Sequence, residues 1–163
     1  MIREKIIKYL TRKNILNRKS PGMEPYQNVS KIGILFNSAN VNYEEIKKLK
    51  EELETDNKTI HTLGYAAKMD GPVIYDVVAK REVSLTGKIK SPEFEKFSDT
   101  NYDYFLVLDR STDYNLSYLA SLCHANCKIG FFHEDEPGVI DFQLKSEKGS
   151  ECSDLMKYLK MIK

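Results

Sequence analysis

The chain has 163 residues, 41% of them hydrophobic, and a formal net charge of +1 at pH 7. This size predicts one domain whose core is large enough to fold without disulfides or a structural metal. The three cysteines are an odd number and give no paired disulfide framework. No N-terminal segment has the apolar core of a secretory signal. The longest apolar run, 104–108, is far shorter than the roughly 20 residues of a membrane span. These features exclude disulfide-rich secreted and transmembrane proteins, so we expect a cytoplasmic location, with the inner membrane surface as a peripheral alternative.

The basic residues are concentrated at the N-terminus. The first 19 residues hold seven Lys and Arg residues and a single acid, a net charge of +6. Apolar residues at three- and four-residue steps, among them Ile2, Ile6 and Leu16, predict an amphipathic helix over 2–16. Such a helix can dock on its own domain, lie on an anionic membrane surface, or bind RNA or an acidic protein, and the sequence leaves these alternatives open. For a partner, the expected binding residues of this arm are Arg3, Lys5, Lys8, Arg12 and Lys13.

A polar stretch with two prolines and a glycine follows the basic helix. Its composition predicts a linker rather than a regular element. We therefore divide the chain into a basic amphipathic helical arm at 1–19, a linker at 20–29 and a single α/β domain at 30–163.

The first half of that domain alternates strands and helices. The apolar run KIGILF (31–36) predicts a buried strand. Asn42 precedes Glu45 by three residues, the spacing of a capping box, and the apolar residues that follow predict a helix over 43–53. The run KTIHTLGYA (58–66), rich in β-branched and aromatic residues, predicts a second strand before a break at AKMDGP.

The second half of the domain predicts further alternation. Residues 73–98 fit a short element plus an extended segment and then a short helix with Ser91 as its N-cap and Pro92 at its first position. The remaining predicted elements are a strand at 104–109, a helix at 114–125 capped by Thr112 or Asp113, strands at 127–132 and 139–145, and a terminal helix beginning near Ser153. This order predicts a three-layer, Rossmann-like α/β fold with a mostly parallel sheet of about five strands.

Two polar turns follow predicted strands and are candidate ligand sites. Asp109, Arg110 and Ser111 stand at the carboxyl end of a strand, where open α/β sheets bind their ligands. Arg110 can hold a phosphate or carboxylate, and Asp109 can accept a proton or bind a ribose hydroxyl. Asn37 and Ser38 begin the other turn, whose backbone N–H groups can face an anion. A solvated turn next to a helix cap explains both sets without a ligand, and the absence of a glycine after the first strand favours this explanation for Asn37 and Ser38.

The sequence predicts no cofactor and no metal site. It lacks both G-x-G-x-x-G and G-x-x-x-x-G-K-[ST], the glycine patterns that hold nucleotide phosphates. Cys123, His124 and Cys127, with His133 and Cys152 further on, supply zinc-ligand residue types at irregular spacing. We expect the cysteines to be buried core thiols instead.

The segments YDYFLVLD (102–109) and ANCKIGFF (125–132) resemble the N-terminal half of the lipopolysaccharide heptosyltransferases, which have the two-domain GT-B fold. Nearly the whole chain is more similar to a family of short, uncharacterised bacterial α/β proteins with a basic N-terminal helix, a first strand ending in LFN, a GKIK segment and a KIG strand. The heptosyltransferases resemble one another in a Gly-Asp pair after the first strand and carry a second domain. Here that place reads NSANVNY, and the chain ends where the second domain would begin.

These observations favour a non-catalytic binding or accessory protein that uses its basic arm to meet an anionic or protein partner. The alternative is an enzyme derived from a glycosyltransferase-like half-domain, in which Asp109 and Arg110 act on a phosphorylated or sugar ligand.

Overall fold

The computed structural model describes residues 1–19, 22–145 and 151–163. In these residues, six strands form one parallel sheet in the order β3-β2-β1-β4-β5-β6. The strands are β1 (Lys31–Asn37), β2 (Thr59–Ala66), β3 (Val77–Ala79), β4 (Asn101–Leu108), β5 (His124–Phe131) and β6 (Phe142–Leu144). Strand order reverses between β1 and β4, as in Rossmann-like folds. The predicted α/β class is therefore confirmed, with an additional short strand, β3, that the sequence did not reveal.

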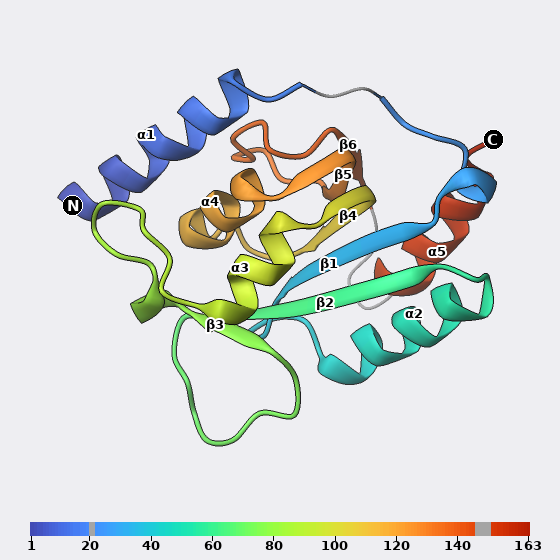
Figure 1. The fold of residues 1–163 in the computed structure, drawn as a ribbon, viewed down its shortest axis with the longest axis horizontal. Coiled ribbons are helices and arrows are strands. Elements are labelled where there is room, and N and C mark those ends of the chain that lie inside the picture. Colours follow the sequence, from blue (N-terminus) through green and yellow to red (C-terminus); the bar gives the residue numbers. More distant parts are fainter. Residues whose placement is uncertain (20–21, 146–150) are drawn as a thin grey trace.

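Helices cover both faces of the sheet (Figure 1). The helices are α1 (Ile2–Leu16), α2 (Tyr43–Thr55), α3 (Pro92–Asp99), α4 (Tyr114–Leu122) and α5 (Glu151–Met161), with short 3-10 turns at Tyr26–Asn28 and Lys80–Glu82. One core lies between the sheet and α2 and α5, and the other between the sheet and α1, α3 and α4. The strands alternate between these cores, so that Ile34 of β1 faces the first and Leu35 the second.

The helix boundaries follow the predicted caps. Asn42 accepts a hydrogen bond from the N–H of Glu44 at the start of α2, Ser91 accepts one from Phe94 at the start of α3, and Asp113 rather than Thr112 caps α4. The helix predicted at 114–125 is too long. It ends at Leu122, because the chain becomes extended at Cys123 and pairs with β4 from His124 onward.

Helix α1 has the predicted bounds, but the residues that it buries differ from those expected. It packs against α4 through Ile7 and Thr11, whereas Ile2 and Leu16 of the expected apolar stripe are exposed. Its Arg3 donates hydrogen bonds to the carbonyl oxygens of Lys80 and Val83. The inward face is partly polar because this guanidinium reaches backbone acceptors, an arrangement that a count of apolar residues does not detect.

The segment predicted as a linker at 20–29 contributes to the core where it is described. Tyr26 and Val29 are buried beside α5 and β1, and the Tyr26 hydroxyl donates to the Asp56 carboxylate over 2.6 Å. The ammonium group of Lys58 binds the carbonyl oxygens of both Tyr26 and Val29, at 2.7 and 2.6 Å. These contacts fix the path by which the chain passes from α1 to β1.

Lys128 of β5 is fully buried under α4, where its ammonium group donates to the carbonyl oxygen of Ala120 over 2.7 Å. Burial, reinforced by the charge of Arg18, lowers the pKa of Lys128 from 10.5 to about 8. Between these values the unfolded chain holds more protons than the folded chain, so stability rises with pH. The charged lysine thus destabilises the fold at neutral pH.

We expect the docking of α1 to be visible in stability. Ile7→Ala should lower the free energy of unfolding by about 2–5 kcal/mol, because it leaves a cavity at a fully buried position. Ile2→Ala, at a position that is 73% exposed on the same helix, should change it by less than about 0.5 kcal/mol. Urea denaturation of both variants measures the difference, and equal effects would contradict the docked helix.

The buried Lys128 predicts that the free energy of unfolding depends on pH. From pH 7 to pH 9.5 the parent chain should gain about 1–2 kcal/mol of stability, and Lys128→Met should be more stable at pH 7 and lose this rise. Exposed Lys5→Met is the matched control and should keep the rise. Denaturation curves below the range in which tyrosines titrate test this, and a parent curve as flat as that of Lys128→Met would refute it.

Candidate functional site

The predicted site residues Asn37, Asp109 and Ser111 meet at the carboxyl ends of β1 and β4. Asp109 is 6% exposed, and its Oδ1 accepts hydrogen bonds from the Asn37 side-chain amide at 3.0 Å and from the Ser111 hydroxyl and backbone N–H at 2.9 and 3.0 Å. The amide of Asn40 adds a further bond to the same oxygen at 2.8 Å. This carboxylate therefore connects the turn after β1 to the turn after β4.

Asn40 links the two turns a second time. Its side-chain oxygen accepts the backbone N–H of Arg110 at 2.9 Å, while the Arg110 guanidinium binds the Asn40 carbonyl oxygen and forms an ion pair with Glu45 of α2 at 3.2 Å. Arg110 is therefore directed toward α2. Ser38 lies apart from this network, because its hydroxyl and its N–H both bind the carbonyl oxygen of Tyr65, each at 2.9 Å.

Two further residues complete the network and were not predicted as part of it. The Nε2 atom of His133 lies 2.8 Å from the Asp109 carbonyl oxygen, and Asp113 caps α4 by accepting the N–H groups of Asn115 and Leu116. Burial and the neighbouring Asp113 raise the pKa of the Tyr65 hydroxyl. His133 follows β5 as Asp109 follows β4, so the rule that ligand sites gather at carboxyl strand ends was the signal available in the sequence.

The space around this network is small on one side and larger on the other. A cavity of about 30 Å³ beside Asp109 and His133 has the volume of a single water molecule. A pocket of about 470 Å³ shares Thr112 and Ser117 with it and is bordered by Lys8 and Arg12 of α1. The larger pocket therefore places basic side chains next to the predicted turn.

Residues 3–162 match the model of a family of unknown function, DUF6913. The chain belongs to this family. No curated protein and no solved structure matches it. The predicted membership of a family of uncharacterised proteins is thus confirmed. The bacterial origin of that family and the likeness to heptosyltransferases stay predictions.

The cysteines of this DUF6913 chain lie in its cores. Cys123 and Cys127 are buried in different cores, on opposite faces of the sheet, and burial raises their pKa values to about 12 and about 11. In the parts of the chain that the structure describes, no cluster of three or more Cys, His, Asp or Glu residues has the arrangement of a metal site. Across the same residues, no helix combines the length and apolarity needed to cross a bilayer.

The hydrogen bonds around Asp109 predict that this side chain stabilises the fold. Asp109→Asn should lower the free energy of unfolding by about 1–3 kcal/mol, because an amide cannot accept all the bonds that converge on the carboxylate. Ser111→Ala, which removes the hydroxyl that donates to Asp109 and accepts from Asn40, should cost about 1–2 kcal/mol. Thermal and urea denaturation provide the measurement, and an Asp109→Asn chain as stable as the parent would contradict this role.

Proposed function

We propose that this protein is a non-catalytic accessory module that attaches to an anionic membrane surface through the outward face of α1. In this proposal, residues 1–19 are the attaching arm of the α/β domain at 30–163. The observation that carries the proposal is the composition of that face. Ile2, Tyr9 and Leu16 are 73%, 65% and 84% exposed, although α1 is docked through its opposite side.

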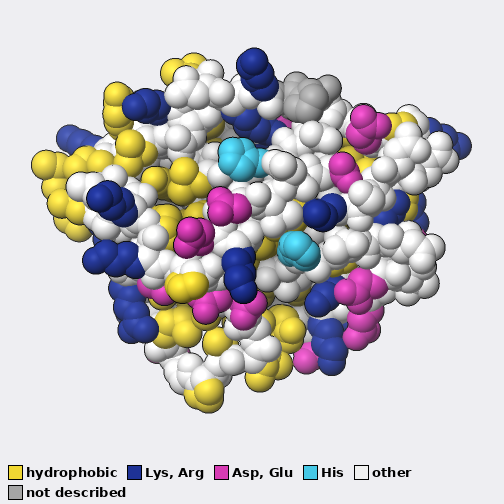
Figure 2. All heavy atoms as spheres, in the orientation of Figure 1, with side chains coloured by type: hydrophobic (Ala, Val, Ile, Leu, Met, Phe, Trp, Pro, Cys, Tyr) yellow, Lys and Arg dark blue, Asp and Glu magenta, His cyan; other side chains and the backbone are white. Residues whose placement is uncertain are grey.

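The exposed apolar residues of α1 share their face with its basic residues. Lys5, Lys8, Arg12 and Lys13 are all exposed. With 3.6 residues per turn, Lys5, Arg12 and Lys13 lie within about 60° of Tyr9 around the helix axis, and Lys8 borders this face about 100° away. In Figure 2, dark blue Lys and Arg side chains and yellow hydrophobic side chains lie together at the upper left, where Figure 1 places α1. Arg3 is the one predicted arm residue that lies on the docked side.

This combination favours a lipid interface over RNA. Apolar side chains flanked by lysines and arginines are typical of helices that lie in the plane of a membrane, with the apolar groups among the acyl chains and the cations at the headgroups. Each Lys or Arg near an anionic surface contributes about 1 kcal/mol. RNA would use the cations but would leave Ile2 and Leu16 without a role.

Vesicle binding tests the proposal. The full chain should sediment with vesicles of phosphatidylglycerol and phosphatidylcholine and release in high salt, because charge attraction is screened within about 8 Å at physiological ionic strength. Changing Lys5, Lys8, Arg12 and Lys13 to Gln should weaken binding at least about tenfold, and so should Ile2→Ser with Leu16→Ser. Binding that does not exceed that to neutral vesicles would refute the proposal.

A second candidate function follows from the pocket of about 470 Å³. Lys8 and Arg12 line it together with the hydroxyl-bearing residues Thr112, Tyr114 and Ser117 and with Asp135. Two cations, hydroxyls and one acid suit a sugar or phosphorylated ligand, including that of a glycosyltransferase-like enzyme. The Lys8 ammonium pairs with Glu4 on the surface, an interaction weak enough to be displaced by a ligand.

Dividing the four Gln substitutions of α1 into two pairs distinguishes membrane attachment from a pocket ligand. For a ligand in this pocket, Lys8→Gln with Arg12→Gln should abolish binding of inorganic pyrophosphate, whereas Lys5→Gln with Lys13→Gln removes equal charge outside the pocket and should leave it nearly unchanged. Titration calorimetry supplies the measurement. Equal losses in the two pairs would contradict a pocket ligand and agree with attachment through the whole face.

A further inference from the structure

The short strand β3 leaves part of β2 without a neighbour. β3 pairs with Gly64, Tyr65 and Ala66. Residues 60–63 of β2 pair with β1 on one side. On the other side, the described part of the chain places no strand beside them. The amino-terminal half of β2 is therefore an open edge of the sheet.

The backbone groups exposed by this edge follow from the hydrogen bonds on either side of it. The N–H of Thr59 points toward β1 and donates to the Ser30 carbonyl oxygen at 2.7 Å. The N–H of Gly64 points the other way and donates to the Asp76 carbonyl oxygen at 2.9 Å. Because successive residues of a strand alternate in direction, Ile60 and Thr62 direct their N–H and C=O groups outward, as Gly64 does.

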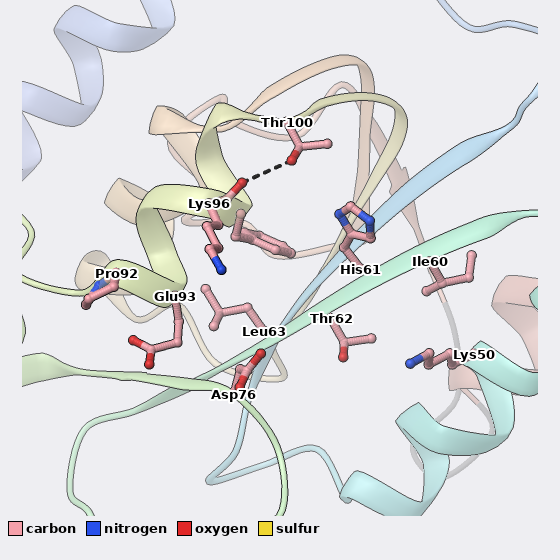
Figure 3. A pocket seen from close by; sticks show the side chains of 11 residues that line it. Lys50, Ile60, His61, Thr62, Leu63, Asp76, Pro92, Glu93, Lys96 and Thr100 are labelled. Carbon is pink, nitrogen blue, oxygen red and sulfur yellow. Dashed lines mark hydrogen bonds between the residues drawn. The ribbon is translucent and has the colours of Figure 1, made fainter.

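The open edge lies at the bottom of a groove of about 600 Å³ (Figure 3). Lys50 of α2 lines one wall, and Glu93 and Lys96 of α3 line the other. A second copy of the chain would bring its own α2 and α3 against these walls if it approached by the same edge. The groove therefore suits a single extended segment without flanking helices.

Charges in the groove differ along its length. In Figure 3, Asp76, Glu93 and Lys96 lie near Leu63, so two acids and one base meet there, whereas Lys50 lies toward Ile60. A segment that runs antiparallel to β2 has its first residues beside Leu63 and its last beside Ile60. A basic first residue and an acidic last residue would then each meet opposite charges.

We propose that the edge of β2 at 60–63 binds an extended peptide segment of another protein by β-strand addition, antiparallel to β2. The outward N–H and C=O groups of Ile60 and Thr62 pair with the peptide backbone. Asp76 and Glu93 receive its basic end, and Lys50 receives its acidic end. This site is separate from the outward face of α1, so either can fail without the other.

Amide hydrogen exchange followed by NMR tests the open edge directly. In the free chain, the amides of Ile60 and Thr62 should exchange at least tenfold faster than those of His61 and Leu63, which face β1. The synthetic peptide Lys-Thr-Val-Thr-Val-Thr-Glu, at millimolar concentration, should slow exchange at Ile60 and Thr62 at least tenfold. The charge-reversed peptide Glu-Thr-Val-Thr-Val-Thr-Lys should bind several-fold more weakly.

Two variants support the assignment. Thr62→Pro removes an outward N–H but no bond to β1, so it should keep the melting temperature within a few degrees and lose protection by the peptide. Lys50→Glu, on α2, makes both ends of the groove acidic, so it should remove the preference between the two peptides even if Thr62→Pro folds poorly. Slow exchange at both amides in the free monomer, or no protection by either peptide, would overturn the proposal. A dimer that Thr62→Pro dissociates would assign the edge to a second copy instead.

Discussion

The Asp109 carboxylate is the interaction on which the carboxyl end of the sheet depends. It connects the turn after β1 to the turn after β4, and these two strands are neighbours only because the strand order reverses between them. Where other Rossmann-like proteins leave this crevice open for a ligand, Asn37 and Asn40 fill it with side-chain amides. The architecture of a ligand site is present, but its central acceptor is used to stabilise the fold.

The two surfaces that we propose for binding lie at the periphery instead. The outward face of α1 and the open edge of β2 involve different elements and different physical interactions, the first apolar and electrostatic, the second backbone hydrogen bonding. Neither surface is covered by the core: α1 docks through Ile7 and Thr11 on its other side, and β3 begins only opposite Gly64. Under both proposals, the protein would connect two partners through surfaces that do not share a residue.

Much of the fold could be predicted because β1, β2, β4 and β5 are apolar runs bounded by caps and turns. β3 could not, since Val77–Ala79 is too short for periodicity and is a strand only through its pairing with β2. Asn37, Asp109 and Ser111 were identified from strand ends, yet their mutual bonds depend on the adjacency of β1 and β4. The sequence did not show which face of α1 docks, because Arg3 counts as polar although it contributes to the docked face.

The docking of α1 on α4 also has a consequence for how the chain folds during synthesis. Arg3 reaches Val83, 80 residues further along, and Asn14 binds Ser121, 107 residues further along. Contacts so distant in sequence form late, because the intervening loop must be closed first. When α1 leaves the ribosome its binding site does not yet exist, so Ile7 and the apolar residues of the outward face are all exposed on the nascent chain. A membrane or chaperone can therefore meet this helix before α4 does.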